Sequence, residues 1–271
     1  MKSKQYLIIL ILPIAFLGSC GRISIEDELW QPESLPVVFA ILSPGNEVGV
    51  YLNRTSLNNS GTDTVNYQEA EVLLRSETSD WVTLRGKSPG DNIYSDLNRE
   101  LKIVAGETYY LEVNLPGFII TSATTIPDSN NAKIKSAKFT KSTEGIAQNE
   151  YVSGLLEATF DIKPENYCIL TNHLGNSLVF GGTFIRQNYF SKRIAVADSV
   201  QNYTLHLHNV DTFLARFLAA KSISNMQHFS NGDITALMGS FNGILPHYSN
   251  ISNGIGLFGS YVSTTYTVPL K

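Results

Sequence analysis

The chain has 271 residues, of which 43% are hydrophobic and 16% charged, and its formal net charge is −4. This length suits one large all-β domain or two smaller ones. The negative charge disfavours nucleic acid and a bare anionic membrane surface as partners, because both attract basic proteins.

The first twenty residues have the pattern of a bacterial lipoprotein signal peptide. Lys2 and Lys4 precede an apolar run from Leu7 to Phe16, and a Leu-Gly-Ser sequence then leads to Cys20. A secretory signal combines a basic start, an apolar segment of about 7–15 residues and a small-residue cleavage site. So short a run cannot span a hydrocarbon core that takes about 20 residues. We therefore predict that residues 1–19 are removed and that Cys20 carries lipid.

Lipid on Cys20 would anchor the protein permanently to a membrane. Loss of the two signal-peptide lysines would change the formal charge from −4 to −6. Residues 20–36 have little periodic apolar content and are predicted to be a tether. With Cys20 acylated, Cys168 has no disulfide partner and is expected as a small apolar residue of a buried strand. The sequence leaves open which membrane leaflet holds the lipid.

Residues 37–127 are predicted to form a β-sandwich of the immunoglobulin or prealbumin type. Short alternating or continuous apolar runs follow one another between turn residues, with no helical period. The runs are Val37–Leu42, Val48–Asn53, Ala70–Arg75, Trp81–Arg85, Asn92–Leu97, Gly106–Val113 and Phe118–Ile126. Tyr109 opens the clearest of these strands, where a tyrosine hydroxyl often ties a Greek-key corner.

A turn-rich break at Pro127–Asn131 separates this domain from a second β domain, predicted over residues 133–271. Its expected strands are Lys133–Lys141, Tyr151–Ile162, Tyr167–Thr171, Val179–Arg186, Tyr203–Val210 and Tyr261–Val268. One helix is expected near 211–221, with Asp211 as its N-cap. Its apolar stripe is predicted to contain Phe213, Leu214, Phe217 and Leu218. An Asn-Gly-x-Gly-x-Phe loop should precede the last strand.

Two patterns resemble functional sites without the context that such sites need. Gly254–Gly259 spells G-x-G-x-x-G, but a serine-rich loop precedes it and a strand follows, so we predict no cofactor. His206 and His208 leave the same face of a strand, while Leu205 and Leu207 point to the core. A metal site needs a third or fourth ligand. These histidines are therefore weak metal candidates, and we expect a solvated polar face.

The segment around the helix and the C-terminal loop is the predicted binding region. It holds many large apolar residues in backbone without regular period, and an exposed patch of this kind marks a protein or ligand contact. The candidate surface residues are Met226, Phe229, Tyr248 and Phe258. The alternative is that this region only covers an open sheet edge.

Several segments together resemble one protein family. They are the early Val-Val strand, Glu69–Val72, Gly106–Val113, Thr125–Pro127 and above all Ser249–Gly259. The chain thereby resembles the lipoproteins of domain-of-unknown-function family 4249 in Bacteroidota. The resemblance implies no activity. It implies an outer-membrane lipoprotein of a kind often encoded beside TonB-dependent transporters.

The patterns and the resemblance together predict a non-enzymatic, lipid-anchored protein. The resemblance implies that it assists a TonB-dependent transporter, either by capturing a small ligand or by binding the transporter. One alternative is a pilin-like or adhesin subunit. Such a subunit would be processed at an Arg or Lys inside its first domain, which exposes a groove for a donor strand. Another is a metal-dependent hydrolase, which would need an acid converging on His206 and His208.

Overall fold

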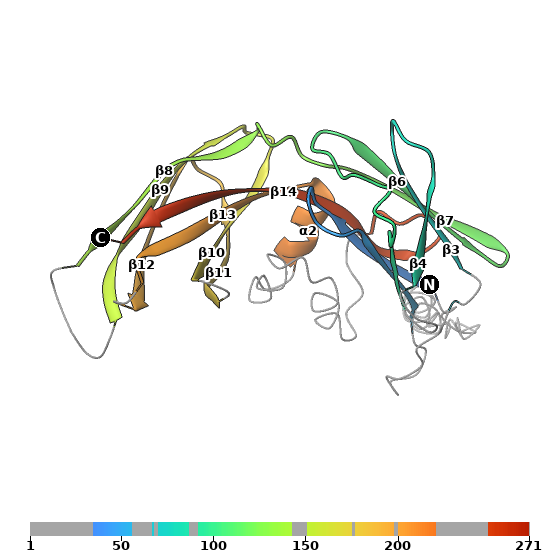
Figure 1. Ribbon diagram of the computed structural model, residues 1–271, viewed down its shortest axis with the longest axis horizontal. Helices are drawn as coiled ribbons and strands as arrows, with labels where there is room; N and C mark the ends of the chain where they lie inside the picture. The colour runs from blue at the N-terminus through green and yellow to red at the C-terminus, as the bar shows by residue number, and fades with distance from the viewer. Residues whose placement is uncertain are drawn as a thin grey trace, which may run out of the picture. The chain divides into compact units, whose positions relative to one another are not determined.

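The computed structural model describes residues 35–55, 67, 70–86, 92–142, 151–174, 177–197, 200–220 and 249–270 (Figure 1). These residues are mainly β, as predicted, and belong to a large mixed sheet and a smaller antiparallel sheet. The predicted signal peptide and Cys20 lie outside the described residues. So do three of the predicted surface residues, Met226, Phe229 and Tyr248.

The N-terminal strands confirm the seven predicted runs. They are β1 (Pro36–Leu42), β2 (Gly49–Arg54), β3 (Glu71–Ser76), β4 (Val82–Gly86), β5 (Ile93–Ser95), β6 (Thr108–Leu115) and β7 (Phe118–Thr125). β1 and β2 form an antiparallel hairpin, with Phe39 opposite Tyr51. The strands continue in the order β1-β2-β5-β4-β3-β6-β7 within the large sheet. β1 begins one residue inside the predicted tether.

β7, the last strand of this sheet, returns to contact the C-terminal segment of the chain. The Ser122 hydroxyl donates to the Asn250 carbonyl oxygen at 2.7 Å, and the Ser252 N–H donates to the Thr121 carbonyl oxygen at 2.9 Å. The enclosed core is apolar and includes Val38, Leu52, Val72, Leu111, Val113 and Phe258. The strands on the two sides of this core therefore belong to one sheet, which folds over itself.

Tyr109 forms the predicted corner. Its side chain is fully buried, and its hydroxyl accepts a hydrogen bond from the Val104 N–H at 2.8 Å and donates to the Lys102 carbonyl oxygen at 2.9 Å. Leu111 and Val113 share its buried face, as the alternation predicts. The hydroxyl thus holds the loop before β6 against the core.

The C-terminal strands form a true two-sheet sandwich. They are β8 (Ala132–Lys141), β9 (Tyr151–Ile162), β10 (Tyr167–Leu174), β11 (Ser177–Ile185), β12 (Tyr189–Ala197) and β13 (Asn202–Val210). The large sheet continues here in the order β14-β13-β10-β11, and β12-β9-β8 is the small sheet. The core between them includes Leu156, Phe160, Leu170, Tyr203, Leu205 and Leu207.

Two features of the small sheet differ from the prediction. β12 is an additional strand, antiparallel to β9. In β8 the register shifts between Ile134 and Ser136, so Ile134 packs on the core together with Ala137 and Phe139. Strict alternation places Ile134 on the opposite face from Ala137. A β-bulge inserts one residue and thereby exchanges the faces that follow it.

β14 (Ile255–Pro269) links the N-terminal and C-terminal strands and is the long red strand of Figure 1. Residues Ile255–Ser260 pair in parallel with β1, and residues Tyr261–Pro269 pair antiparallel with β13. The predicted loop through Phe258 is wrong, because the strand begins six residues before Tyr261. Its first half is buried on both faces, which removes the alternation that marks a half-exposed strand.

Helix α2 (Thr212–Ala220) lies where the helix was predicted. Leu214, Phe217 and Leu218 are buried, whereas Phe213 is 37% exposed and Ala215 takes its place in the apolar stripe. The prediction for Phe213 is wrong, because the buried stripe consists of Leu214, Ala215, Phe217 and Leu218 and leaves Phe213 outside it. Among the described residues, no helix is long and apolar enough to cross a membrane.

Candidate ligand pocket

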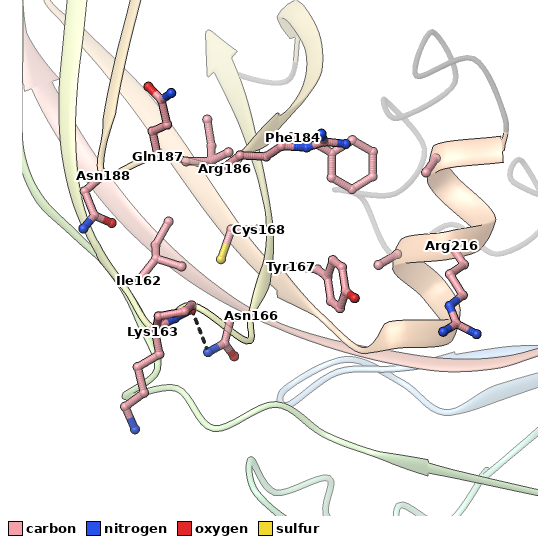
Figure 2. A pocket seen from close by; sticks show the side chains of 14 residues that line it. Ile162, Lys163, Asn166, Tyr167, Cys168, Phe184, Arg186, Gln187, Asn188 and Arg216 are labelled. Atoms are coloured by element: carbon pink, nitrogen blue, oxygen red, sulfur yellow. Dashed lines mark hydrogen bonds between the residues drawn. The ribbon is translucent and has the colours of Figure 1, made fainter.

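A pocket of about 360 Å³ opens where the β9–β10 turn, the end of β11 and helix α2 meet (Figure 2). This volume lies at the lower end of the range for small-molecule sites. The lining residues are Ile162, Lys163, Pro164, Asn166, Tyr167, Cys168, Phe184, Ile185, Arg186, Gln187, Asn188, Ala215, Arg216 and Ala219. They belong to three segments that are distant in the sequence.

The β9–β10 turn is held in place by hydrogen bonds on both sides. Asn166 closes the turn, since its backbone N–H donates to the Lys163 carbonyl oxygen at 3.0 Å and its side-chain amide donates to the same oxygen at 3.3 Å. The Asn209 side chain on β13 donates to the Asn166 Oδ1 at 3.0 Å. The Lys163 N–H donates to the Asn131 carbonyl oxygen at 3.0 Å. These bonds restrain the backbone that carries Lys163 and Tyr167.

The inner wall of the pocket is apolar and electrically neutral. Cys168 and Ile185 are buried there and Phe184 is half-buried. Burial raises the pKa of the Cys168 thiol to about 12, so the thiol stays protonated at neutral pH. The prediction that Cys168 is a small apolar residue in a buried strand is confirmed.

The rim of the pocket carries polar and cationic side chains. Lys163, Arg186 and Arg216 are exposed and come from the β9–β10 turn, the residue after β11 and helix α2. Tyr167 is 44% exposed. In Figure 2 Lys163 and Arg216 lie at opposite ends of the group, with Asn166 and Tyr167 between them. No acidic residue is found among the lining residues in the described part of the chain.

Asp211 fixes the helix that carries Arg216. Its Oδ1 accepts hydrogen bonds from the N–H groups of Phe213 at 2.6 Å and Leu214 at 2.9 Å, which confirms the predicted N-cap. Its Oδ2 accepts from the backbone N–H and the hydroxyl of Ser260 on β14 and from the Thr124 hydroxyl on β7. Burial raises the pKa of the Asp211 carboxyl despite these donors. One side chain therefore joins α2, β14 and β7.

The two predicted histidines lie on one face of β13, as expected, with their ring centroids 6.1 Å apart. The expected solvation is wrong for His208, which is only 2% exposed. Its Nε2 lies 2.9 Å from the Thr171 hydroxyl and its Nδ1 2.6 Å from the Ser263 hydroxyl. Neighbouring strands bring these hydroxyls to the ring. In the described segments of the chain, no three His, Cys, Asp or Glu side chains are grouped as metal ligands.

Phe258 is the one predicted surface residue that the structure describes. It is fully buried in the N-terminal core, so it cannot form part of an exposed surface. Sequence reasoning missed Lys163, Arg186 and Arg216, which lie on separate elements. The only local signals were a polar turn after each of two strands and a cation on the exposed face of an amphipathic helix.

The sequence matches the family described as "Domain of unknown function (DUF4249)" over residues 22–267. The chain belongs to this family. The match covers both β regions, including the pocket and most of β14, so the family resemblance predicted from sequence is confirmed. No curated protein matches the chain.

Proposed function

We propose that this member of the DUF4249 family is a non-enzymatic, lipid-anchored accessory protein of the outer membrane. It captures a small ligand in the pocket between the β9–β10 turn and α2, and it assists a TonB-dependent transporter in taking up that ligand. The pocket is the observation that carries the proposal. Its size suits a small molecule, and its wall is held by a hydrogen-bonded turn and a capped helix.

The sequence pattern supports the location. Lipid on Cys20 would place the domain next to the membrane, and residues 20–36 would give it reach. A binding site on a rigid scaffold, carried close to a transporter, raises the local ligand concentration at the transporter. The preformed pocket fits capture, because a rigid site loses little entropy when it binds.

The anchor and the pocket can be tested together in the full-length protein. Ala219 lines the pocket and is exposed on α2, so Ala219→Trp should fill the pocket without disturbing the core. Wild type should fractionate with the outer membrane and release a bound compound on denaturation, measured by mass spectrometry. Ala219→Trp should keep the membrane location and lose the compound. Cys20→Ala should lose the membrane location and keep the compound.

Phe213→Trp is the matched control, since Phe213 is exposed on the same helix and does not line the pocket. Uptake of the released compound should slow in a strain without the gene and recover with wild type, not with Ala219→Trp. Equal ligand content in wild type and Ala219→Trp would contradict capture at this pocket. Wild type in the soluble fraction would contradict the anchor.

A further inference from the structure

We infer that the pocket selects a small organic anion, one that carries at least two oxyanion groups such as carboxylates or phosphates. This inference rests on the proposed ligand capture and names the chemistry of the ligand. Three cationic side chains, Lys163, Arg186 and Arg216, line a single pocket, and among the fourteen lining residues that the structure describes none is acidic. Because the cations come from three separate elements, they can contact an anion from several sides.

This charge distribution runs against the rest of the chain. Acidic residues outnumber basic ones, 24 to 20. Glu165 belongs to the β9–β10 turn but does not line the pocket. Like charges that line one site favour a ligand of opposite charge.

The inner wall adds no competing negative charge. Cys168 is buried and keeps its proton at neutral pH, because burial raises the pKa of its thiol. A guanidinium can hold a carboxylate or a phosphate through two parallel hydrogen bonds, and a lysine ammonium adds a mobile point charge. Arg186, after β11, and Lys163, in the β9–β10 turn, therefore supply two complementary modes of oxyanion recognition from separate segments of the rim.

The remaining lining residues indicate an organic ligand and not a bare ion. Tyr167 presents an exposed ring and hydroxyl at the rim, and the side chains of Gln187 and Asn188 add amide groups. Phe184 and Ile185 form part of the apolar inner wall of the pocket. A volume of about 360 Å³ exceeds what a single inorganic ion fills and suits a compact carbon skeleton.

Calorimetry with the lipidated protein in detergent, at low ionic strength, tests the inference with citrate and pyrophosphate as probes and glucose as the neutral reference. We expect at least one oxyanion to bind and glucose not to bind. Lys163→Ala and Arg186→Ala should each weaken binding about tenfold, since each removes a hydrogen bond to a charged oxygen of the ligand. Added KCl should weaken oxyanion binding to the wild-type protein, because salt screens the attraction between the charges. Preference between the probes distinguishes carboxylate from phosphate recognition.

Arg193→Ala is the matched control, because Arg193 is an exposed cation on β12 outside the pocket. It should bind the probe like wild type, and all three variants should melt like wild type. Failure of both probes to bind, or equal weakening by Arg193→Ala, would overturn the inference. A neutral compound released from the wild-type protein would overturn it too while leaving ligand capture intact. Release of no compound at all would count against the proposed function itself.

Discussion

The N-terminal strands β1–β7 and the C-terminal strands β8–β13 enclose their cores in different ways. The N-terminal strands belong to a single sheet that folds over itself, and β7 is tied back to β14 and its preceding loop through Thr121, Ser122 and Thr124. The C-terminal strands belong to separate sheets that face each other, and their connecting turns meet helix α2 at one end. The described pocket lies at that end.

Two fully buried tyrosines show the same contrast. Tyr109, in the N-terminal core, has two backbone partners for its hydroxyl. Tyr203, in the C-terminal core, has none among the described residues. Burial raises the pKa of both phenols. The N-terminal region thus satisfies the Tyr109 hydroxyl by folding a loop onto it, whereas the two-sheet sandwich leaves the Tyr203 hydroxyl without a partner among the described residues.

The largest effect is expected where the two regions share a strand. Gly256 has a φ of +133°, and an added Cβ would lie 1.8 Å from the Val38 carbonyl oxygen. Gly256→Ala must therefore separate β14 from β1, and we expect it to lower the free energy of unfolding by about 3 kcal/mol or more. Denaturant unfolding followed by circular dichroism measures this loss.

Gly45→Ala is the control for backbone strain alone. Gly45 also has a positive φ, +83°, but an added Cβ would meet no atom within 4 Å. Gly45→Ala should lower the free energy of unfolding by about 1 kcal/mol. If Gly256→Ala cost no more than Gly45→Ala, the parallel pairing of β1 and β14 would not be the tight junction between the two regions.

The strands themselves were largely predictable from the sequence, because most are half-buried and alternate with period two. Tyr109 and Asp211 were predictable for a similar reason, since a corner tyrosine and a helix cap depend on neighbours a few residues away. In β12 the Lys192-Arg193 pair interrupts the apolar run of an edge strand, so the pattern was hidden. The bulge in β8 shifts the faces within one strand and has no composition signal.

The pairing of β14 and the pocket could not be predicted. Parallel pairing of Ile255–Ser260 with β1 joins segments more than 200 residues apart, and the sequence of a strand does not encode its partner. The pocket depends on Lys163, Arg186 and Arg216 meeting only after both sheets and α2 have packed. Local periodicity reports the face on which a residue lies, not the residues that face it from other elements.

Asp211→Ala should have the largest effect on stability after Gly256→Ala. It removes the N-cap of α2 and the hydrogen bond from Thr124 on β7 together. We expect a loss of about 2–3 kcal/mol in the free energy of unfolding, from the helix cap and from the backbone N–H of Ser260, which loses its acceptor. Thermal and denaturant unfolding measure it. A loss below about 0.5 kcal/mol would show that Asp211 does not hold the two regions together.

The pH dependence provides a second measurement at Asp211. Because burial raises the folded-state pKa of its carboxyl, the folded protein holds this proton at pH values where the unfolded chain has released it. The free energy of unfolding of wild type relative to Asp211→Ala should therefore fall as the pH rises from the unfolded-state pKa of about 3.9 through the folded-state pKa. An advantage that grows over this range would contradict the raised pKa.

The smallest and sharpest comparison exchanges each buried tyrosine for phenylalanine. Tyr109→Phe leaves the Val104 N–H and the Lys102 carbonyl oxygen without their partner, and should cost about 1–2 kcal/mol. Tyr203→Phe removes a buried hydroxyl that has no partner among the described residues, so the change should be neutral or slightly stabilising. Both substitutions remove one oxygen from a fully buried ring, so apolar burial and cavity size change alike, and the difference in unfolding free energy isolates the hydrogen bonds. Equal losses at the two positions would mean that Tyr203 also has a partner, and the contrast between the two cores would then not lie in their buried hydroxyls.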